Sequence, residues 1–88
     1  MIKKEFKITN KTGLHARPAA LLVKTTGKFK SNIFISKDGY EVNGKSIMGV
    51  MTLAAETGSK IEVIIDGEDE VEAIEAIEDL ISHNFYED

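Results

Sequence analysis

A histidine, an arginine and a proline stand close together in the segment NKTGLHARPAA, which covers residues 10–20. Pro18 suits the first turn of a helix, because its fixed φ matches a helix and its missing N–H is not needed there. We therefore expect a helix that begins just after His15. The first N–H groups of a helix have no intrahelical acceptor, and together with the helix dipole they form an anion site. Here those groups belong to Ala16 and Arg17.

An imidazole beside such an anion site can attack a phosphoryl group as the neutral base and then carry it as a covalent adduct. The N–H groups of Ala16 and Arg17 would stabilise the added negative charge, and the Arg17 guanidinium would give a second, charged contact. Gly13 gives the preceding loop the freedom to turn the imidazole outward. The pattern indicates His15 as a catalytic group, and the alternative is an ordinary surface or capping histidine.

The composition limits the class of protein. The 88 residues contain no cysteine, which excludes disulfides, thiolate metal sites and iron–sulfur clusters, and we expect no metal and no other cofactor. The length predicts a single domain over residues 1–88. No apolar run is long enough for a signal peptide or a membrane span, so we expect a cytoplasmic protein without membrane contact.

The charges are divided along the chain. All eleven lysine and arginine residues lie in residues 1–65 beside five acidic residues, whereas residues 66–88 contain ten acidic residues and neither lysine nor arginine. This division favours a basic face that docks with acidic partners, and the alternative is a solvated acidic helix with scattered lysines. The overall acidity and the lack of aromatic residues interleaved with basic ones on a strand disfavour nucleic-acid binding.

Hydrophobic periodicity predicts the elements that position these residues. Strands are expected over residues 2–8, 32–37, around Val42 and over 60–66, and helices over residues 16–26, from Ser46 onward and from Asp69 to Ser82. Gly27 should end the first helix, Asp-Gly in the turn at 37–40 indicates a hairpin, and Asp69 with Glu72 has capping-box spacing. The order β-α-β-β-α-β-α predicts two layers, with helices packed on one sheet.

Two helices should share an exposed binding face. On a helical wheel, Lys24 and Lys28 lie on the same side of the first helix as Arg17, and Leu21 beside them should be exposed. The core side of this helix comprises Ala19, Leu22, Val23 and Thr26. In the second helix the core positions are Val50, Leu53 and Ala54, which leaves a methionine-containing patch outside. The predicted partner-binding residues are Ala20, Leu21, Lys24, Lys28, Ile47, Met48 and Met51. The alternatives are a lone exposed leucine without a role and methionines that belong to the core.

Two segments resemble the HPr family, the histidine-containing phosphocarrier proteins of the bacterial sugar phosphotransferase system. GLHARPA at residues 13–19 resembles the active-site signature of that family, and KSIMGVMTLA at residues 45–54 resembles its regulatory serine region. The resemblance extends along essentially the whole chain. It implies an α+β, two-layer open-faced β-sandwich, in which a four-stranded antiparallel sheet of order 1-4-2-3 is covered on one side by three helices.

The resemblance also implies roles for single residues. His15 would accept a phosphoryl group on Nδ1 from enzyme I and pass it to the IIA unit of a sugar permease, with Arg17 assisting, so the protein would be a carrier and not an enzyme. Some relatives have threonine at the position of Ala16, so a hydroxyl contact to the phosphate is missing here. A monomer is expected.

Ser46 has two expected roles that are compatible. It is predicted as the N-cap of the second helix, and such a cap contributes about 1 kcal/mol. The resemblance implies that a serine kinase/phosphorylase modifies it, and that the phosphorylated form binds a catabolite-control transcription factor. The patch that includes Met48 and Met51 would bind these partners and enzyme I.

Other classes fit the residues less well. Acylphosphatases have a similar length and element order, but they need a phosphate-binding loop of the type GxVQGVxxR, which this sequence does not contain. A metal carrier of comparable fold would need a CxxC motif. A family paralogue that acts only as a Ser46-regulated cofactor would lack the active histidine, and His15 argues against that class.

Overall fold

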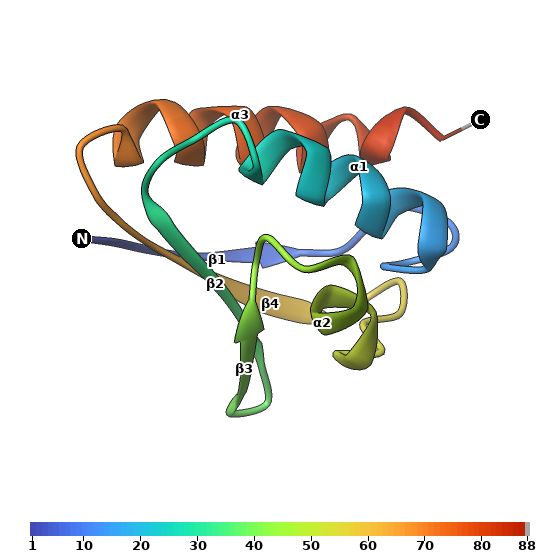
Figure 1. Ribbon diagram of the computed structural model, residues 1–88. Helices are drawn as coiled ribbons and strands as arrows, with labels where there is room; N and C mark the ends of the chain where they lie inside the picture. Colours follow the sequence, from blue (N-terminus) through green and yellow to red (C-terminus); the bar gives the residue numbers. More distant parts are fainter. Residues whose placement is uncertain (88) are drawn as a thin grey trace.

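Four strands form one antiparallel sheet in the computed structural model, which describes residues 1–87 (Figure 1). The strands are β1 (Ile2–Lys7), β2 (Asn32–Lys37), β3 (Tyr40–Asn43) and β4 (Lys60–Asp66). Their order across the sheet is β1-β4-β2-β3. The expected α+β fold and the order implied by the family resemblance are therefore confirmed.

Alternating side chains determine which face of the sheet is buried. In the central strand β4, Ile61, Val63 and Ile65 are buried. Both neighbouring strands place apolar residues against them, since Phe6 of β1 lies opposite Ile61 and Ile35 of β2 lies opposite Val63. These cross-strand pairs form the floor of the core.

In residues 1–87 three α-helices cover this floor: α1 (Ala16–Thr26), α2 (Ile47–Thr52) and α3 (Glu70–Ser82). In Figure 1, α1 and α3 lie side by side over the sheet, and α2 lies next to α1. A short 3₁₀ turn, η1 (Asn84–Tyr86), follows α3 and also contacts α1. Within the described residues, none of the helices has the length and apolar character that a membrane crossing requires.

The predicted hairpin is present between β2 and β3. Its two central residues, Asp38 and Gly39, have φ of 51° and 83°. Positive φ at both positions is typical of the tight turn that matches the twist of two paired strands. The Asp-Gly pair was therefore a correct signal.

The predicted capping box of α3 is absent, because the side chain of Asp69 does not cap the helix. Its carboxylate instead accepts hydrogen bonds from the Ser31 hydroxyl, from the N–H of Lys30 at 2.8 Å and from the N–H of Ser31 at 2.9 Å. The Ser31 hydroxyl, followed by the Lys30 N–H, lowers the pKa of Asp69 to about 2. Donors from the loop before β2 thus replace the local cap, and they tie the start of α3 to the sheet.

Gly27 ends α1 as predicted, whereas the end of α2 differs from expectation. The residue after α1, Gly27, has a helical φ of −65°, so the helix ends in a tightened turn in which the Lys28 N–H donates to the Thr25 carbonyl at 3.2 Å. After α2 the chain turns through Ala54, which has φ of 50° and is exposed, and Ala55 is buried in its place. The prediction that Ala54 faces the core was therefore wrong.

Candidate functional site

The loop before α1 is anchored to the segment that follows α2. Leu14 is buried, and its N–H donates to the carbonyl of Ala55 at 2.8 Å. Gly13 has φ of 67°, and a Cβ at this position would lie only 2.4 Å from the same carbonyl oxygen. Both the backbone conformation and the close approach require glycine here. This anchor fixes where the chain leaves the core, which is immediately before His15.

His15 is the N-terminal cap of α1 through its backbone and not through its ring. The residue is extended, with φ of −74° and ψ of −175°, and its carbonyl accepts the first helical hydrogen bond from Ala19 at 2.9 Å. The side chain is exposed and makes no cap bond. In residues 1–87 no hydrogen bond occupies the imidazole, so both ring nitrogens are available for chemistry.

The donors predicted beside His15 are in place. The helical ladder starts with the Ala19 N–H, which leaves the N–H groups of Ala16 and Arg17 without an intrahelical acceptor. Pro18 has no N–H to offer, and its side chain is buried. Arg17 is exposed and forms no ion pair within the described part of the chain. The start of α1 can therefore offer two N–H groups and one guanidinium to an anion.

His15 lines a hollow of about 690 Å³ that brings together residues from three separate parts of the chain. Next to His15 and the first turn of α1, its wall contains Lys11, Thr12, Glu56, Thr57 and Glu87. None of these five residues was predicted from the sequence as part of the site. They lie in loops and at the end of the chain, where no periodic pattern indicates which residues meet in space.

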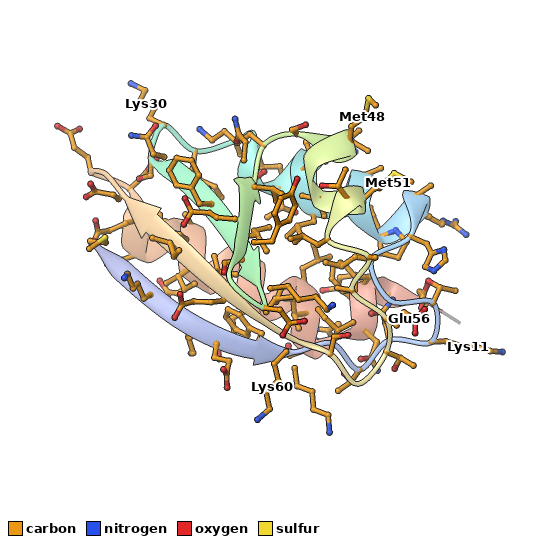
Figure 2. The ribbon with its side chains drawn as sticks, turned by 90° about the horizontal axis from the view of Figure 1, so that it is seen from below. Lys11, Lys30, Met48, Met51, Glu56 and Lys60 are labelled. Carbon is orange, nitrogen blue, oxygen red and sulfur yellow. The ribbon has the colours of Figure 1, made fainter. Side chains whose placement is uncertain are left out.

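The exposed patch predicted on α2 is present and adjoins His15. The exposed fractions are 43% for Ile47, 79% for Met48 and 41% for Met51, whereas Val50 of the same helix is fully buried. Figure 2 shows Met48 and Met51 projecting from α2. Met51 and His15 line one further hollow, of about 290 Å³. The apolar patch and the imidazole therefore belong to one continuous surface.

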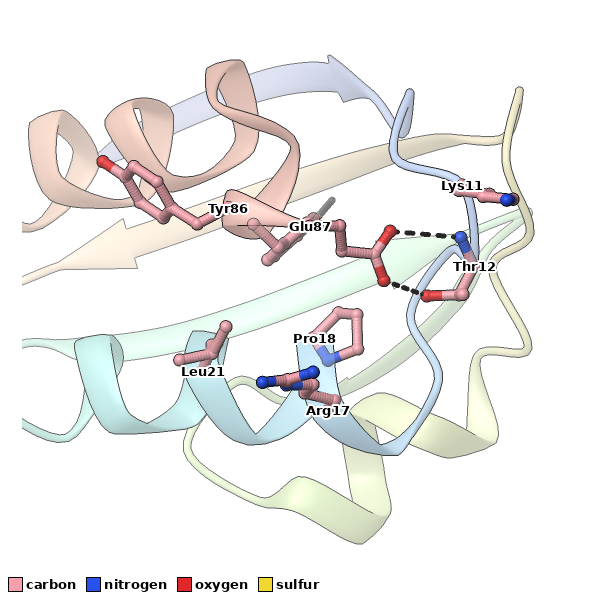
Figure 3. A pocket seen from close by; sticks show the side chains of 8 residues that line it. Lys11, Thr12, Arg17, Pro18, Leu21, Tyr86 and Glu87 are labelled. Atoms are coloured by element: carbon pink, nitrogen blue, oxygen red, sulfur yellow. Dashed lines mark hydrogen bonds between the residues drawn. The ribbon is translucent and has the colours of Figure 1, made fainter.

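The α1 side of this surface agrees with the prediction except at Leu21. Ala20, Lys24 and Lys28 are exposed, and neither lysine forms an ion pair in residues 1–87. Leu21 was expected to be exposed, but it is half-buried and packs against the core. Leu21 lines a cleft together with Tyr86 of the C-terminal turn η1 (Figure 3).

Ser46 is the N-cap of α2, as predicted. Its Oγ accepts a hydrogen bond from the Gly49 N–H at 3.0 Å, and its carbonyl accepts from Val50 at 2.9 Å. The residue is half-buried and directly precedes the exposed Ile47. A modification of Ser46 would therefore change both the start of α2 and the edge of the apolar patch.

Comparisons with known proteins agree with this arrangement. Residues 2–83 match the family model described as "PTS HPr component phosphorylation site". The chain is 54% identical to the phosphocarrier protein HPr of Xylella fastidiosa over 88 residues, which are 100% of this chain and 99% of that protein. It is 54% identical to the HPr-like protein Crh of Halalkalibacterium halodurans over 77 residues, which are 88% of this chain and 92% of that protein.

The fold is similar to that of a solved structure along its whole length. The crystal structure of HPr-C-His from Thermoanaerobacter tengcongensis superposes with a TM-score of 0.96 at 50% identity. The match covers 100% of this chain and 99% of that one. This similarity includes the loop, the helix start and the patch described above.

A pair of glycine substitutions tests the anchor of the His15 loop. We expect Gly13→Ala to lower the free energy of unfolding by about 2 kcal/mol more than Gly39→Ala, because a Cβ at Gly13 would meet backbone atoms whereas a Cβ at Gly39 would meet open space. Both glycines have positive φ, so the backbone cost of left-handed alanine is common to the two variants. Urea denaturation followed by circular dichroism measures the difference. Equal losses would mean that the loop tolerates displacement from Ala55.

Proposed function

Because the chain belongs to the HPr family of phosphocarrier proteins of the phosphotransferase system, we propose that His15 is the residue that carries the phosphoryl group. The group would come from phosphorylated enzyme I and would pass to IIA units of sugar permeases. The observation that carries this proposal is the exposed, unbonded imidazole of His15 beside the two free N–H groups and the guanidinium at the start of α1.

The transfer is a displacement at phosphorus. The lone pair of a neutral ring nitrogen of His15, Nδ1 by resemblance to the family, attacks the phosphorus as the bond to the donor breaks, and the donor leaves with that electron pair. The proton on the other ring nitrogen stays in place. The N–H groups of Ala16 and Arg17 and the Arg17 guanidinium stabilise the phosphoryl oxygens in the transition state and in the adduct. Transfer to a IIA unit is the same displacement with the adduct as donor.

The surface around His15 supplies the partner-binding part of the proposal. The cations on α1, which form no ion pair within residues 1–87, suit partners with acidic surfaces. The α2 patch offers flexible methionine side chains that adapt to different contacts. A carrier must recognise enzyme I and IIA units in turn with the same face. The combination of exposed charge and an apolar patch next to the reacting atom meets this requirement.

Phosphorylation by enzyme I and phosphoenolpyruvate tests the carrier role. We expect mass spectrometry to find one added phosphate on wild type and on His83→Ala, and none on His15→Ala, because only His15 lies at the donor cluster. The adduct should be acid-labile and stable to base, as expected for a phosphoramidate. His83→Ala is the matched control, since it removes the other histidine of the chain. Equal labelling of His15→Ala would contradict the proposal.

We further propose that Ser46 is a regulatory phosphorylation site. The support is its position, one residue before the exposed patch and at the start of α2, together with the resemblance of its segment to the family's regulatory serine region. A serine kinase/phosphorylase would modify it, and a catabolite-control transcription factor would bind the modified form. The helix start tolerates negative charge, so a phosphate should leave the fold intact, whereas an acidic partner should be repelled.

The variants Ser46→Asp and Ser46→Ala separate the effect of charge from the effect of the cap. We expect Ser46→Asp to slow transfer from enzyme I to His15 by about tenfold. An added negative charge opposite an acidic surface makes the binding free energy less favourable by an amount on the order of kilocalories per mole, and about 1.4 kcal/mol corresponds to a tenfold loss of affinity. Aspartate is also a good N-cap, so the melting temperature of Ser46→Asp should not fall below that of wild type. Ser46→Ala should keep the wild-type rate and lose about 1 kcal/mol of stability. The rate of transfer and the thermal melt are measured together.

Two results would count against charge-based regulation by Ser46. An unchanged transfer rate in Ser46→Asp would leave the residue as a structural cap. A rate that falls equally in Ser46→Ala and Ser46→Asp would mean that the residue acts through the stability of α2.

A further inference from the structure

The end of the chain folds back onto the loop that leads to His15. The carboxylate of Glu87 accepts hydrogen bonds from the hydroxyl of Thr12, from the N–H of Thr12 at 3.3 Å and from the side-chain amide of Asn10 at 3.0 Å. Figure 3 shows Glu87 with its two bonds to Thr12. One carboxylate therefore takes three donors from a single loop.

Asn10 extends this contact to the residues just before His15. Its side chain is buried, and its Nδ2 also donates to the carbonyl of Gly13 at 2.9 Å. The loop is thus held on two sides, by Glu87 through Thr12 and Asn10, and by the Leu14 hydrogen bond to Ala55. A loop held by one of these anchors alone has more freedom to move.

The turn that aims Glu87 at the loop adopts an unfavourable backbone. Asn84, Phe85 and Tyr86 have φ of 51°, 55° and 55°, and none of the three is glycine. Successive left-handed residues of this kind are rare and persist where their surroundings hold them. Here Phe85 is 1% exposed in the core, and the Thr9 hydroxyl donates to Asn84 Oδ1 at 2.5 Å. The position of Glu87 is therefore fixed by contacts on both sides of the turn.

Glu87 is charged when it makes these contacts. The hydrogen bond from the Thr12 hydroxyl is the main cause that lowers the pKa of Glu87, and the amide of Asn10 contributes in the same direction. The carboxylate lies in the wall of the hollow that holds His15, yet within residues 1–87 it forms no ion pair with Arg17. Its hydrogen bonds go to the loop, and the guanidinium stays free for a phosphoryl group.

We propose that Glu87 is a positioning residue for phosphoryl transfer, which holds the loop of residues 10–14 so that His15 and the free N–H groups of α1 keep their relative geometry. The proposal rests on the proposed role of His15 as the carrier. Glu87 itself does not touch the transferred group. Small displacements of a reacting group have large effects on rate, so a loosened loop should slow the chemical step.

Steady-state kinetics with phosphorylated enzyme I as donor test this role. In Glu87→Ala we expect kcat to fall by about fivefold or more with KM within about twofold of wild type, because the docking residues on α1 and α2 are unchanged. Glu87→Gln keeps an amide oxygen that can accept from the Thr12 N–H and from Asn10, and it should recover most of the lost rate. Glu75→Ala is the control, since Glu75 is an exposed glutamate of α3 whose side chain makes no hydrogen bond or ion pair in residues 1–87.

A double variant shows whether Glu87 acts through the loop. Thr12→Val removes the hydroxyl donor, and Thr12→Val combined with Glu87→Ala should be no slower than Glu87→Ala alone, because both substitutions break the same contact. In the unphosphorylated protein, the Thr12 amide proton should shift in wild type when the pH falls below the ordinary titration range of a glutamate, because the pKa of Glu87 is lowered, and it should not do so in Glu87→Gln.

Several outcomes would overturn the positioning role. One is an unchanged kcat in Glu87→Ala. Another is a faster transfer in Glu87→Ala, which would mean that the carboxylate repels the phosphate directly. The third is a double variant in which the losses of the two single variants add. If wild type itself is not phosphorylated at His15, the proposed carrier function fails. If wild type is phosphorylated and Glu87→Ala matches it, the carrier function stands and only the positioning role fails.

Discussion

The site depends on one hydrogen bond between two loops, from the N–H of Leu14 to the carbonyl of Ala55 at 2.8 Å. Both residues are buried, so water does not compete for this bond, and Gly13 packs against the same carbonyl. The bond places the start of α1 beside the end of α2. For this reason the imidazole of His15 and the side chain of Met51 line a common hollow, and in the proposed function a partner that docks on the α2 patch would also reach the imidazole.

The distribution of charge keeps the surface around His15 available. The acidic residues of the second part of the chain lie mainly on and around α3. Two of them pair with groups in and just before β1: Lys4 contacts Glu78 at 2.7 Å and the N-terminal amine of Met1 contacts Glu70 at 3.1 Å. The cations of α1 have no such partners within residues 1–87. A field of this kind attracts an acidic partner toward one face and repels it from the other. The acidic and basic residues are thus separated in space as well as along the chain.

The sequence predicts the local parts of this structure and fails where distant segments meet. The start of α1 at His15 and the cap at Ser46 depend on residues within one helical turn, so their patterns were sufficient. Asp69 has capping-box spacing, but donors from a loop far away in the sequence take its carboxylate. The left-handed turn before Glu87 contains no glycine that would indicate it, and the half-buried state of Leu21 does not follow from the helical wheel of α1 alone. The strand order came from resemblance to a family, because hydrophobic patterns do not define which strands are neighbours.

The most direct test of the account is an amide NMR spectrum of the protein before and after phosphorylation by enzyme I and phosphoenolpyruvate. The central claim is that the N–H groups of Ala16 and Arg17 are free donors that receive the phosphoryl oxygens. We predict that these two amide protons move downfield more than any others, because they form new charge-assisted hydrogen bonds. The amides of α3 should keep their positions. If His15 is phosphorylated while the amide protons of Ala16 and Arg17 remain where they were, the start of α1 is not the anion site and the account is wrong.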